Sequence, residues 1–230
     1  MTQIKLSPQT LSVLKNYSTI NSSIVIRKGN QLKTISVGEN SVATYVCEEQ
    51  FPQDFAIYDL SKFLSAISLF ESPTLQFGDP NYVLITGGGK NMKYYFSDPE
   101  ITLKSAPDRD IKFPETDMEF TLSHADIISI LDASSIFNMN DVKISSENGQ
   151  IILTVCDKED DTSNTYFQTI SGETTGDYEM FMKIENLRLW KPDSIPERAS
   201  GSYNVKISSK LITEWKHSKL NLTYYIALEP

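Results

Sequence analysis

The organisation of this chain follows from two fourteen-residue stretches, SPQTLSVLKNYSTI (residues 7–20) and SHADIISILDASSI (residues 123–136). Each begins with a serine that can cap a helix, and each then carries apolar residues three and four positions apart. A shift of 116 residues lays Leu14 over Ile130. The chain therefore contains an internal repeat, and each half opens with a short amphipathic helix.

A second pair of helix signals supports the repeat. Asp59 precedes an apolar stripe that starts at Leu60, and a shift of 127 residues lays this start over Asn186 and Leu187. An aspartate or asparagine before such a stripe is a common helix start. We therefore expect four short helices, the last of which begins at Asn186 and ends before Pro192.

The rest of the chain mostly predicts β-strands. Residues 151–155 and 203–207 alternate apolar and polar side chains, which is typical of strands with one buried face. The run Gly87-Gly88-Gly89-Lys90 has some likeness to a phosphate-binding loop, but it lacks the required spacing and precedes a strand. We expect a hairpin turn there.

A polar joint separates the two halves. It runs over about residues 105–114 and is bracketed by Pro107 and Pro114. The sequence thus predicts an α+β fold with two similar domains, residues 1–107 and 108–230, and this joint as the connector between them.

Charge is distributed unevenly between the halves. The net charge is −9, and residues 108–230 carry all of this excess, with twelve basic and twenty-one acidic residues. An acidic average argues against a simple nucleic-acid-binding protein. A basic face on an acidic chain is still compatible with DNA, so the positions of the lysines matter.

The polar faces of three predicted helices carry those basic residues. Lys15 lies on the first, Lys62 on the second, and Arg188 and Lys191 on the fourth. Such faces are either ordinary solvated helix surface or a surface that neutralises phosphates without reading bases. The residues alone leave both interpretations open.

Signals for catalysis are weak. No nucleophile, base and orienting group can be assembled into one site. Cys47 and Cys156 lie in strand-like runs, where buried structural thiols are expected. His124 opens a helix, where we expect solvent, and His217 lies in a polar stretch. We expect no catalytic residue, no metal site, no cofactor and, with no long apolar run or secretion signal, no membrane partner.

The last strand keeps apolar side chains almost to the end of the chain. Residues 222–228 read LTYYIAL. This segment is either a final sheet strand or an exposed patch on which a partner docks.

Three stretches considered together resemble one protein family. They are LSPQTLSVLKNYSTINS (residues 6–22), AIYDL (residues 56–60) with the helix that follows, and YIALE (residues 225–229). In order and spacing they resemble the DNA polymerase sliding clamps of T-even-like bacteriophages. The ending at residues 224–227 is also similar to that of proliferating cell nuclear antigen.

The resemblance implies a DNA-clamp fold assembled as a homotrimeric ring with pseudo-sixfold symmetry. Each of the two domains per chain would contribute antiparallel sheets and two short helices. Twelve helices, each about 10 Å wide, would enclose a hole of roughly 28 Å, which admits duplex DNA with a layer of water.

The resemblance also implies which residues face the DNA. They are Lys15 and Lys62 in the first domain and Arg188 and Lys191 in the second. The third helix departs from the family pattern because it carries Asp132 where relatives tend to have basic residues. The positive field in the hole would then come mainly from the first domain.

Partner proteins are implied in the same way. Clamps bind partner peptides in an apolar pocket between the connector and the last strand, which here points to Ile111, Phe113, Tyr225, Ala227 and Leu228. The implied partners are the phage DNA polymerase, an ATP-dependent clamp loader and late-transcription sigma or co-activator proteins. The expected setting is the cytoplasm of an infected bacterial host.

Two alternatives remain at this stage. One is a β-rich phage structural or assembly protein that uses the same strands for assembly, and the other is a hydrolase with an unrecognised site. Neither alternative predicts retention on circular DNA.

Overall fold

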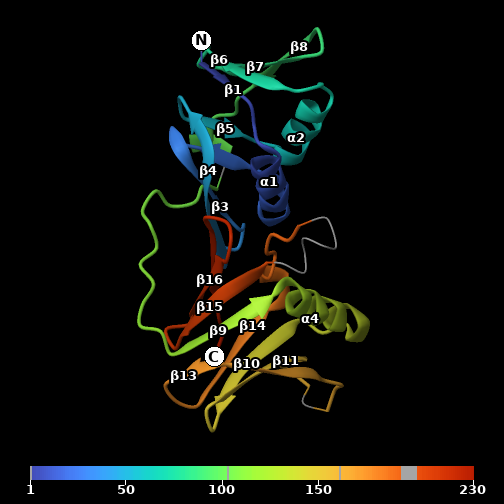
Figure 1. Cartoon of the computed structure of the whole chain (residues 1–230), viewed down its shortest axis with the longest axis vertical. Coiled ribbons are helices and arrows are strands. Elements are labelled where there is room, and N and C mark those ends of the chain that lie inside the picture. The colour runs from blue at the N-terminus through green and yellow to red at the C-terminus, as the bar shows by residue number, and fades with distance from the viewer. Residues whose placement is uncertain (1, 103, 161, 193–200) are drawn as a thin grey trace. The chain divides into compact units, whose positions relative to one another are not determined.

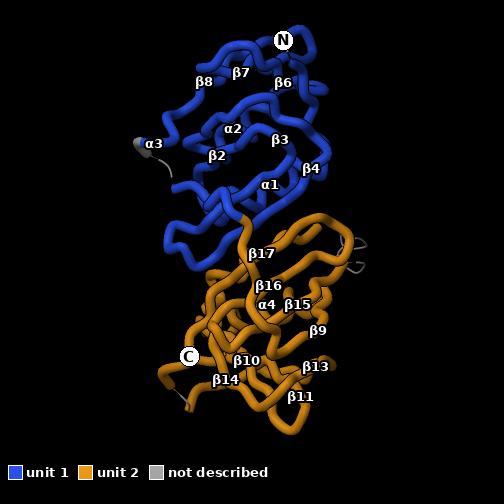
Figure 2. The backbone as a smooth tube through the Cα atoms, turned by 90° about the vertical axis from the view of Figure 1, so that its left-hand side faces the viewer, with its two compact units in different colours: residues 1–109 blue, residues 110–230 orange. Residues whose placement is uncertain are grey.

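The computed structural model describes residues 2–102, 104–160, 162–192 and 201–230 (Figure 1). The chain divides into two compact units, residues 1–109 and residues 110–230 (Figure 2). Both units combine helices with antiparallel sheets, so the chain has an α+β fold. None of the helices in the described ranges is long and apolar enough to cross a membrane.

The described residues of unit 1 form eight strands and three helices. The strands are β1 (Thr2–Ile4), β2 (Ile24–Ile26), β3 (Gly29–Ile35), β4 (Ser41–Phe51), β5 (Phe55–Ile57), β6 (Thr74–Phe77), β7 (Tyr82–Gly87) and β8 (Lys90–Tyr95). The helices are α1 (Pro8–Ile20), α2 (Leu60–Ser68) and α3 (Pro99–Thr102). Four strands form a sheet in the order β1-β6-β7-β8, while β2 pairs with β5 and β3 pairs with β4.

Unit 2 repeats this scheme with longer sheets. Its strands are β9 (Met118–Ser123), β10 (Asp141–Glu147), β11 (Gln150–Cys156), β12 (Tyr166–Ile170), β13 (Gly172–Thr174), β14 (Tyr178–Lys183), β15 (Ser202–Ser208), β16 (Ile212–His217) and β17 (Leu222–Ala227). The helices are α4 (His124–Phe137) and the single-turn 3-10 helix η1 (Ile184–Asn186). One sheet has the order β12-β11-β10-β14, and in the other β13, β9, β15, β16 and β17 are neighbours in that order.

Three of the four predicted helices are confirmed. The side chains of Ser7, Asp59 and Ser123 each accept a hydrogen bond from a backbone N–H in the first turn of α1, α2 and α4. Ser123 and Asp126 also form a reciprocal capping box. These local hydrogen bonds satisfy donors that a helix start leaves free, which fixes where each helix begins.

The predicted strand faces and the hairpin are confirmed as well. Ile151, Leu153 and Val155 are buried in β11, as are the alternate residues of β15. Gly88 and Gly89, between β7 and β8, have φ angles of 54° and 74°. Two consecutive left-handed residues make the tight hairpin turn that glycine favours.

The fourth predicted helix is wrong. The chain makes the 3-10 turn η1, which the Leu187 N–H closes onto the Ile184 carbonyl, and the described residues 187–192 that follow are not helical. Trp190 is held instead by two tyrosines, because its N–H donates to the Tyr224 hydroxyl at 3.0 Å and its carbonyl accepts from the Tyr203 hydroxyl at 2.7 Å. A segment of six residues before Pro192 is too short to nucleate a helix against these contacts.

Candidate nucleic-acid interface and partner surface

Helix α1 presents Lys15 to solvent because its other face is buried. Val13, Leu14 and Tyr17 pack into unit 1 and are fully buried. The helix start is pinned by Glu49 of β4, which accepts hydrogen bonds from the Ser7 N–H and the Thr10 hydroxyl. Lys15 is thus held outward on a fixed helix.

The sequence analysis missed Glu49, although a signal for it was present. The alternation of β4 places this acid at an inward position, and its residue is only 8% exposed. Burial raises its pKa, but the hydrogen bonds from Ser7 and Thr10 outweigh that effect and hold the pKa below its ordinary value. A buried, ionised Glu49 therefore serves to position α1.

Helix α2 lies beside α1 in the same unit and presents Lys62 (Figure 1). Phe63 is buried and meets the ring of Tyr94 edge-on at 4.9 Å, which fixes the opposite face of the helix. The Lys62 side chain is 83% exposed and forms an ion pair with Asp59 at 3.0 Å. The hydrogen bond to Asp59 raises the pKa of Lys62, so this lysine is charged but partly neutralised by its neighbour.

Serine and threonine hydroxyls on the exposed faces of α1 and α2 donate hydrogen bonds to carbonyls of their own helices. Ser65 donates to the Ser61 carbonyl at 2.8 Å, and Ser68 donates to the Ser65 carbonyl at 2.7 Å. On α1, Ser18 and Thr19 make the same kind of bond at 2.7 Å. The combined face of α1 and α2 is therefore small, polar and cationic, with these hydroxyl hydrogens already used.

Helix α4 offers a different face. It contains no lysine or arginine, and Asp132 is exposed on it together with Ser129. The Ser129 hydroxyl again donates to its own helix, at the Ala125 carbonyl. The two predicted cations of unit 2, Arg188 and Lys191, are exposed but lie in the non-helical segment after η1, where Arg188 Nε donates to the Glu185 carbonyl at 2.9 Å.

The predicted partner residues differ in exposure. Ile111, Phe113 and Tyr225 are half-buried, and Ala227 is exposed. Leu228 is only 6% exposed, so its side chain offers almost no surface to a partner.

The side chain of Tyr225 on β17 bonds to the neighbouring strand β16. Its hydroxyl donates to Glu214 at 3.0 Å. Burial, followed by Glu214 and the charge of Asp110, raises the pKa of Tyr225 to about 12.

The end of the chain is fastened beyond β17. Glu229 exchanges two backbone hydrogen bonds with Phe181 of β14, at 2.7 and 2.8 Å. Lys158 Nζ donates to the Pro230 carbonyl at 2.8 Å and lies over the Phe181 ring. The last residues are therefore part of the folded surface.

The expectation that His124 is solvated is wrong. It is 2% exposed, stacks on His217 at 5.3 Å and meets Trp190 and Tyr203 edge-on. Its N–H donates to the Gly201 carbonyl, and a Cβ at Gly201 would lie 2.3 Å from the His124 ring. The residues that enclose His124 are far from it along the chain, so the local pattern that predicts a helix start could not predict its burial.

The cluster of His124, His217, Trp190 and Tyr203 makes the stability of the protein sensitive to acid. Burial, followed by the nearby His124 and Lys219, lowers the pKa of His217 to about 4. The unfolded chain takes up a proton near pH 6.5 that the folded chain refuses until about pH 4, so stability falls as the pH drops through this window. We expect a loss of up to about 3 kcal/mol in the free energy of unfolding, measured by urea unfolding at several pH values.

His217→Asn is the matched control for this titration. An asparagine oxygen can replace Nδ1, which accepts the N–H groups of Lys219 and Leu220. The variant should show a shallower slope between pH 6.5 and 4.5. An identical slope would assign the acid sensitivity to other groups.

Within the described ranges, no three His, Cys, Asp or Glu side chains are grouped so that they could hold a metal ion. Cys47 and Cys156 are free and buried, and burial raises the pKa of both thiols. A buried, protonated thiol is a poor nucleophile.

Comparison with known proteins identifies the family. A family model described as DNA polymerase processivity factor matches residues 5–75. The sliding clamp of Vibrio phage KVP40 is 31% identical over 232 residues, covering 98% of this chain and 99% of that protein. The sliding clamp of Enterobacteria phage T4 is 39% identical over 66 residues, which is 29% of each chain.

Solved structures share the fold at much lower identity. Proliferating Cellular Nuclear Antigen from Entamoeba histolytica superposes with a TM-score of 0.70 at 15% identity, covering 99% of this chain and 98% of that one. A. fulgidus PCNA, solved with the C-terminal region of FEN-1, gives a TM-score of 0.72 at 11% identity, covering 100% and 99%. With this fold and a full-length phage relative, the chain belongs to the sliding clamps, the processivity factors of DNA polymerases.

Proposed function

We propose that this chain assembles as a homotrimer into a ring around duplex DNA and tethers the phage DNA polymerase to its template. The observation that carries the proposal is the face of α1 and α2, which exposes Lys15 and Lys62 among hydroxyls bonded to their own helices. Lysines on such a face attract phosphates at long range without fixing a register. The ring performs no chemistry; it keeps the polymerase on DNA by topology.

DNA contact in this proposal is uneven around the ring. Lys15 and Lys62 supply the main attraction, and Arg188 and Lys191 add exposed charges from the non-helical segment. Helix α4 contributes Asp132 and no cation.

Two outer strands suit the joint between neighbouring chains. β8 and β12 are each the last strand of a four-stranded sheet, and each carries an exposed aromatic ring, Tyr95 at 65% and Phe167 at 66%. The exposed apolar residues Leu69, Ile136 and Phe137 lie at the ends of α2 and α4. Open strand edges readily pair with another chain.

Charge favours pairing β8 of one chain with β12 of the next. β8 contains Lys90 and Lys93, whereas exposed Glu159 and Asp160 lie in the loop before β12. A joint between two different edges is directional, so successive copies continue around a ring until it closes.

The connector and the last strand form the proposed docking surface for polymerase. Ile111, Phe113 and Tyr225 offer half-buried apolar and aromatic groups, and Ala227 of the last strand is exposed. A clamp loader and late-transcription sigma or co-activator proteins are further proposed partners of this surface, in the cytoplasm of the infected host.

A DNA-retention assay tests the proposal. The protein should form particles of about three chain masses, remain on closed circular DNA and slide off after the circle is cut. A β-rich structural protein of the phage would show no difference between the two DNA forms, and that result would reject the clamp function.

Tyr225→Ala tests the docking surface. We expect about a tenfold loss in polymerase stimulation, because truncating a central aromatic residue commonly costs 1–2 kcal/mol or more. Tyr225→Phe is the matched control, since it removes only the bond to Glu214. Primer extension on a long template measures both variants, and unchanged stimulation by Tyr225→Ala would reject this assignment.

A further inference from the structure

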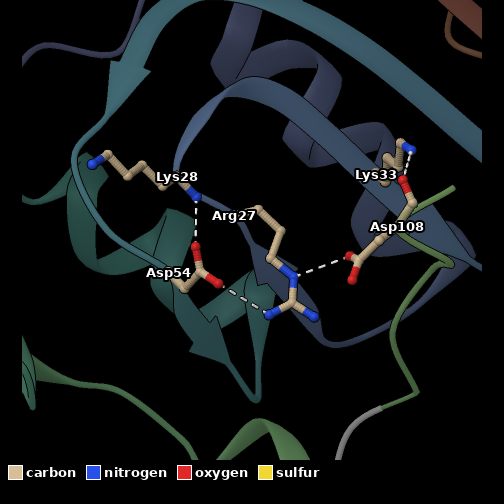
Figure 3. Close-up of polar contacts among 5 residues, drawn as sticks. All are labelled: Arg27, Lys28, Lys33, Asp54 and Asp108. Carbon is tan, nitrogen blue, oxygen red and sulfur yellow. Dashed lines mark hydrogen bonds and ion pairs between the residues drawn. The ribbon is translucent and has the colours of Figure 1, made fainter. Parts of the chain in front are cut away.

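The start of the connector is held on unit 1 by side chains from two neighbouring strands (Figure 3). Arg27 Nε donates to Oδ1 of Asp108 at 3.2 Å, and Lys33 Nζ donates to the Asp108 carbonyl oxygen at 3.0 Å. Arg27 directly follows β2, and Lys33 belongs to β3. Asp108 is thus fixed through its side chain and through its backbone.

Arg27 is itself oriented by the β2–β5 ladder. Ile26 pairs with Phe55, so Asp54 lies opposite Arg27 just beyond the ladder. Asp54 Oδ2 accepts from Arg27 Nη1 at 3.1 Å, and its Oδ1 accepts the Lys28 N–H at 2.7 Å. The Lys28 N–H, and to a lesser extent Arg27, hold the pKa of Asp54 below its ordinary value.

The guanidinium group therefore spans two carboxylates. Figure 3 shows Asp54 and Asp108 on opposite sides of Arg27, each paired with a different nitrogen. Arginine offers several donors in a rigid plane, whereas lysine offers one point charge. Lysine at this position could not hold both acids in the same geometry.

Polar contacts rather than packing hold this segment. Residues 104–108 are exposed except for half-buried Ala106, and a pocket of about 440 Å³ lies beside them, lined also by Val25 and Gln31. Ion pairs this exposed are weak and are screened by salt. The hold on Asp108 is therefore reversible.

We propose that Arg27 is a positioning residue for the connector and sets the affinity of the docking surface for its partner. Ile111 follows Asp108 by three residues, a reach of at most about 11 Å. The next fixed residue before Asp108 is Lys104, which contacts Asn21 and Glu39. If Lys104 were the nearest fixed point, Ile111 could lie up to about 25 Å from it. Releasing Asp108 would lengthen this tether from three residues to seven, which increases the conformational freedom of Ile111 about fourfold.

Trypsin reports this release directly. Arg109 and Lys112 lie in the connector, so Arg27→Ala should raise the rate of cleavage there about three- to tenfold. The polymerase concentration needed for half-maximal stimulation in primer extension should rise by a similar factor. Arg27→Lys should raise both quantities as much as Arg27→Ala does. Combining Asp108→Ala with Arg27→Ala should raise neither quantity further.

Lys28→Ala is the matched control. It removes a cation from the same pocket, while the bond from Lys28 to Asp54 uses the backbone and is kept. Trypsin should cleave the connector of this variant at the wild-type rate. In about 0.5 M salt the rate at which trypsin cleaves the wild-type connector should approach the rate for Arg27→Ala, because salt screens the ion pair.

The proposal rests on the docking part of the proposed function, and the two fail in different ways. Wild-type protein that is not retained on circular DNA, or that does not stimulate polymerase, would reject the clamp function. Suppose that the wild type passes both tests. If trypsin then cleaves the connector of Arg27→Ala at the wild-type rate, or this variant needs the wild-type polymerase concentration for half-maximal stimulation, Arg27 does not position the connector.

Discussion

Lys15→Glu combined with Lys62→Glu is expected to reduce the amount of clamp that loads onto circular DNA at least tenfold. Both side chains are exposed on adjacent helices of unit 1, and reversing them replaces the cations of α1 and α2 with acids. Attraction to phosphate depends steeply on the number of cations, and a trimer would lose six. The loaded amount is measured on nicked circles over a range of salt concentrations.

The control reverses two other exposed lysines, Lys210 and Lys216, which lie in unit 2. It changes the net charge equally but leaves the α1 and α2 face intact. The salt dependence should flatten only in the Lys15 and Lys62 variant. Equal behaviour of the two variants would show that net charge, and not this helix face, governs loading.

Phe167→Glu is expected to convert the trimer into single chains, with about a hundredfold or greater weakening of assembly. The substitution places an acid on the exposed edge of β12, which follows a loop that already carries Glu159 and Asp160. Burying an unpaired charge in a strand joint costs several kcal/mol. Sedimentation velocity or particle mass measures the result, and DNA retention should be lost together with the trimer.

A charge swap makes this test specific. Lys90→Glu with Lys93→Glu should weaken assembly, as should Glu159→Lys with Asp160→Lys, whereas the four changes combined should restore it. Val37→Glu, at an exposed apolar site in the turn between β3 and β4, is the control and should remain trimeric. A trimer that survives Phe167→Glu would place the joint elsewhere.

Helix starts were predictable from sequence because they depend on neighbours along the chain. Ser7, Asp59 and Ser123 bond to residues three positions ahead, so the pattern contains the whole interaction. The positions of Lys15 and Lys62 follow from the same periodicity. The Asp59–Lys62 ion pair was also visible as an i, i+3 spacing, and it reduces the charge that Lys62 offers.

The segment after η1 could not be predicted in this way. Its conformation depends on hydroxyls of Tyr203 and Tyr224, which lie thirteen or more residues away. The same non-local packing buries His124 between His217 and Trp190. Apolar residues at 187, 189 and 190 fit a short helix and a buried extended segment equally well, and only tertiary contacts decide between them.

The inward-turned hydroxyls of Ser65, Ser68 and Ser129 have a consequence for movement along DNA. Hydroxyl hydrogens that are already bonded to their own helix do not form directional bonds to DNA that must break and re-form at each base-pair step. One-dimensional diffusion over these helix faces should therefore have a low barrier that is nearly independent of base composition. Friction would then come from the drag of the solvent and the attached polymerase.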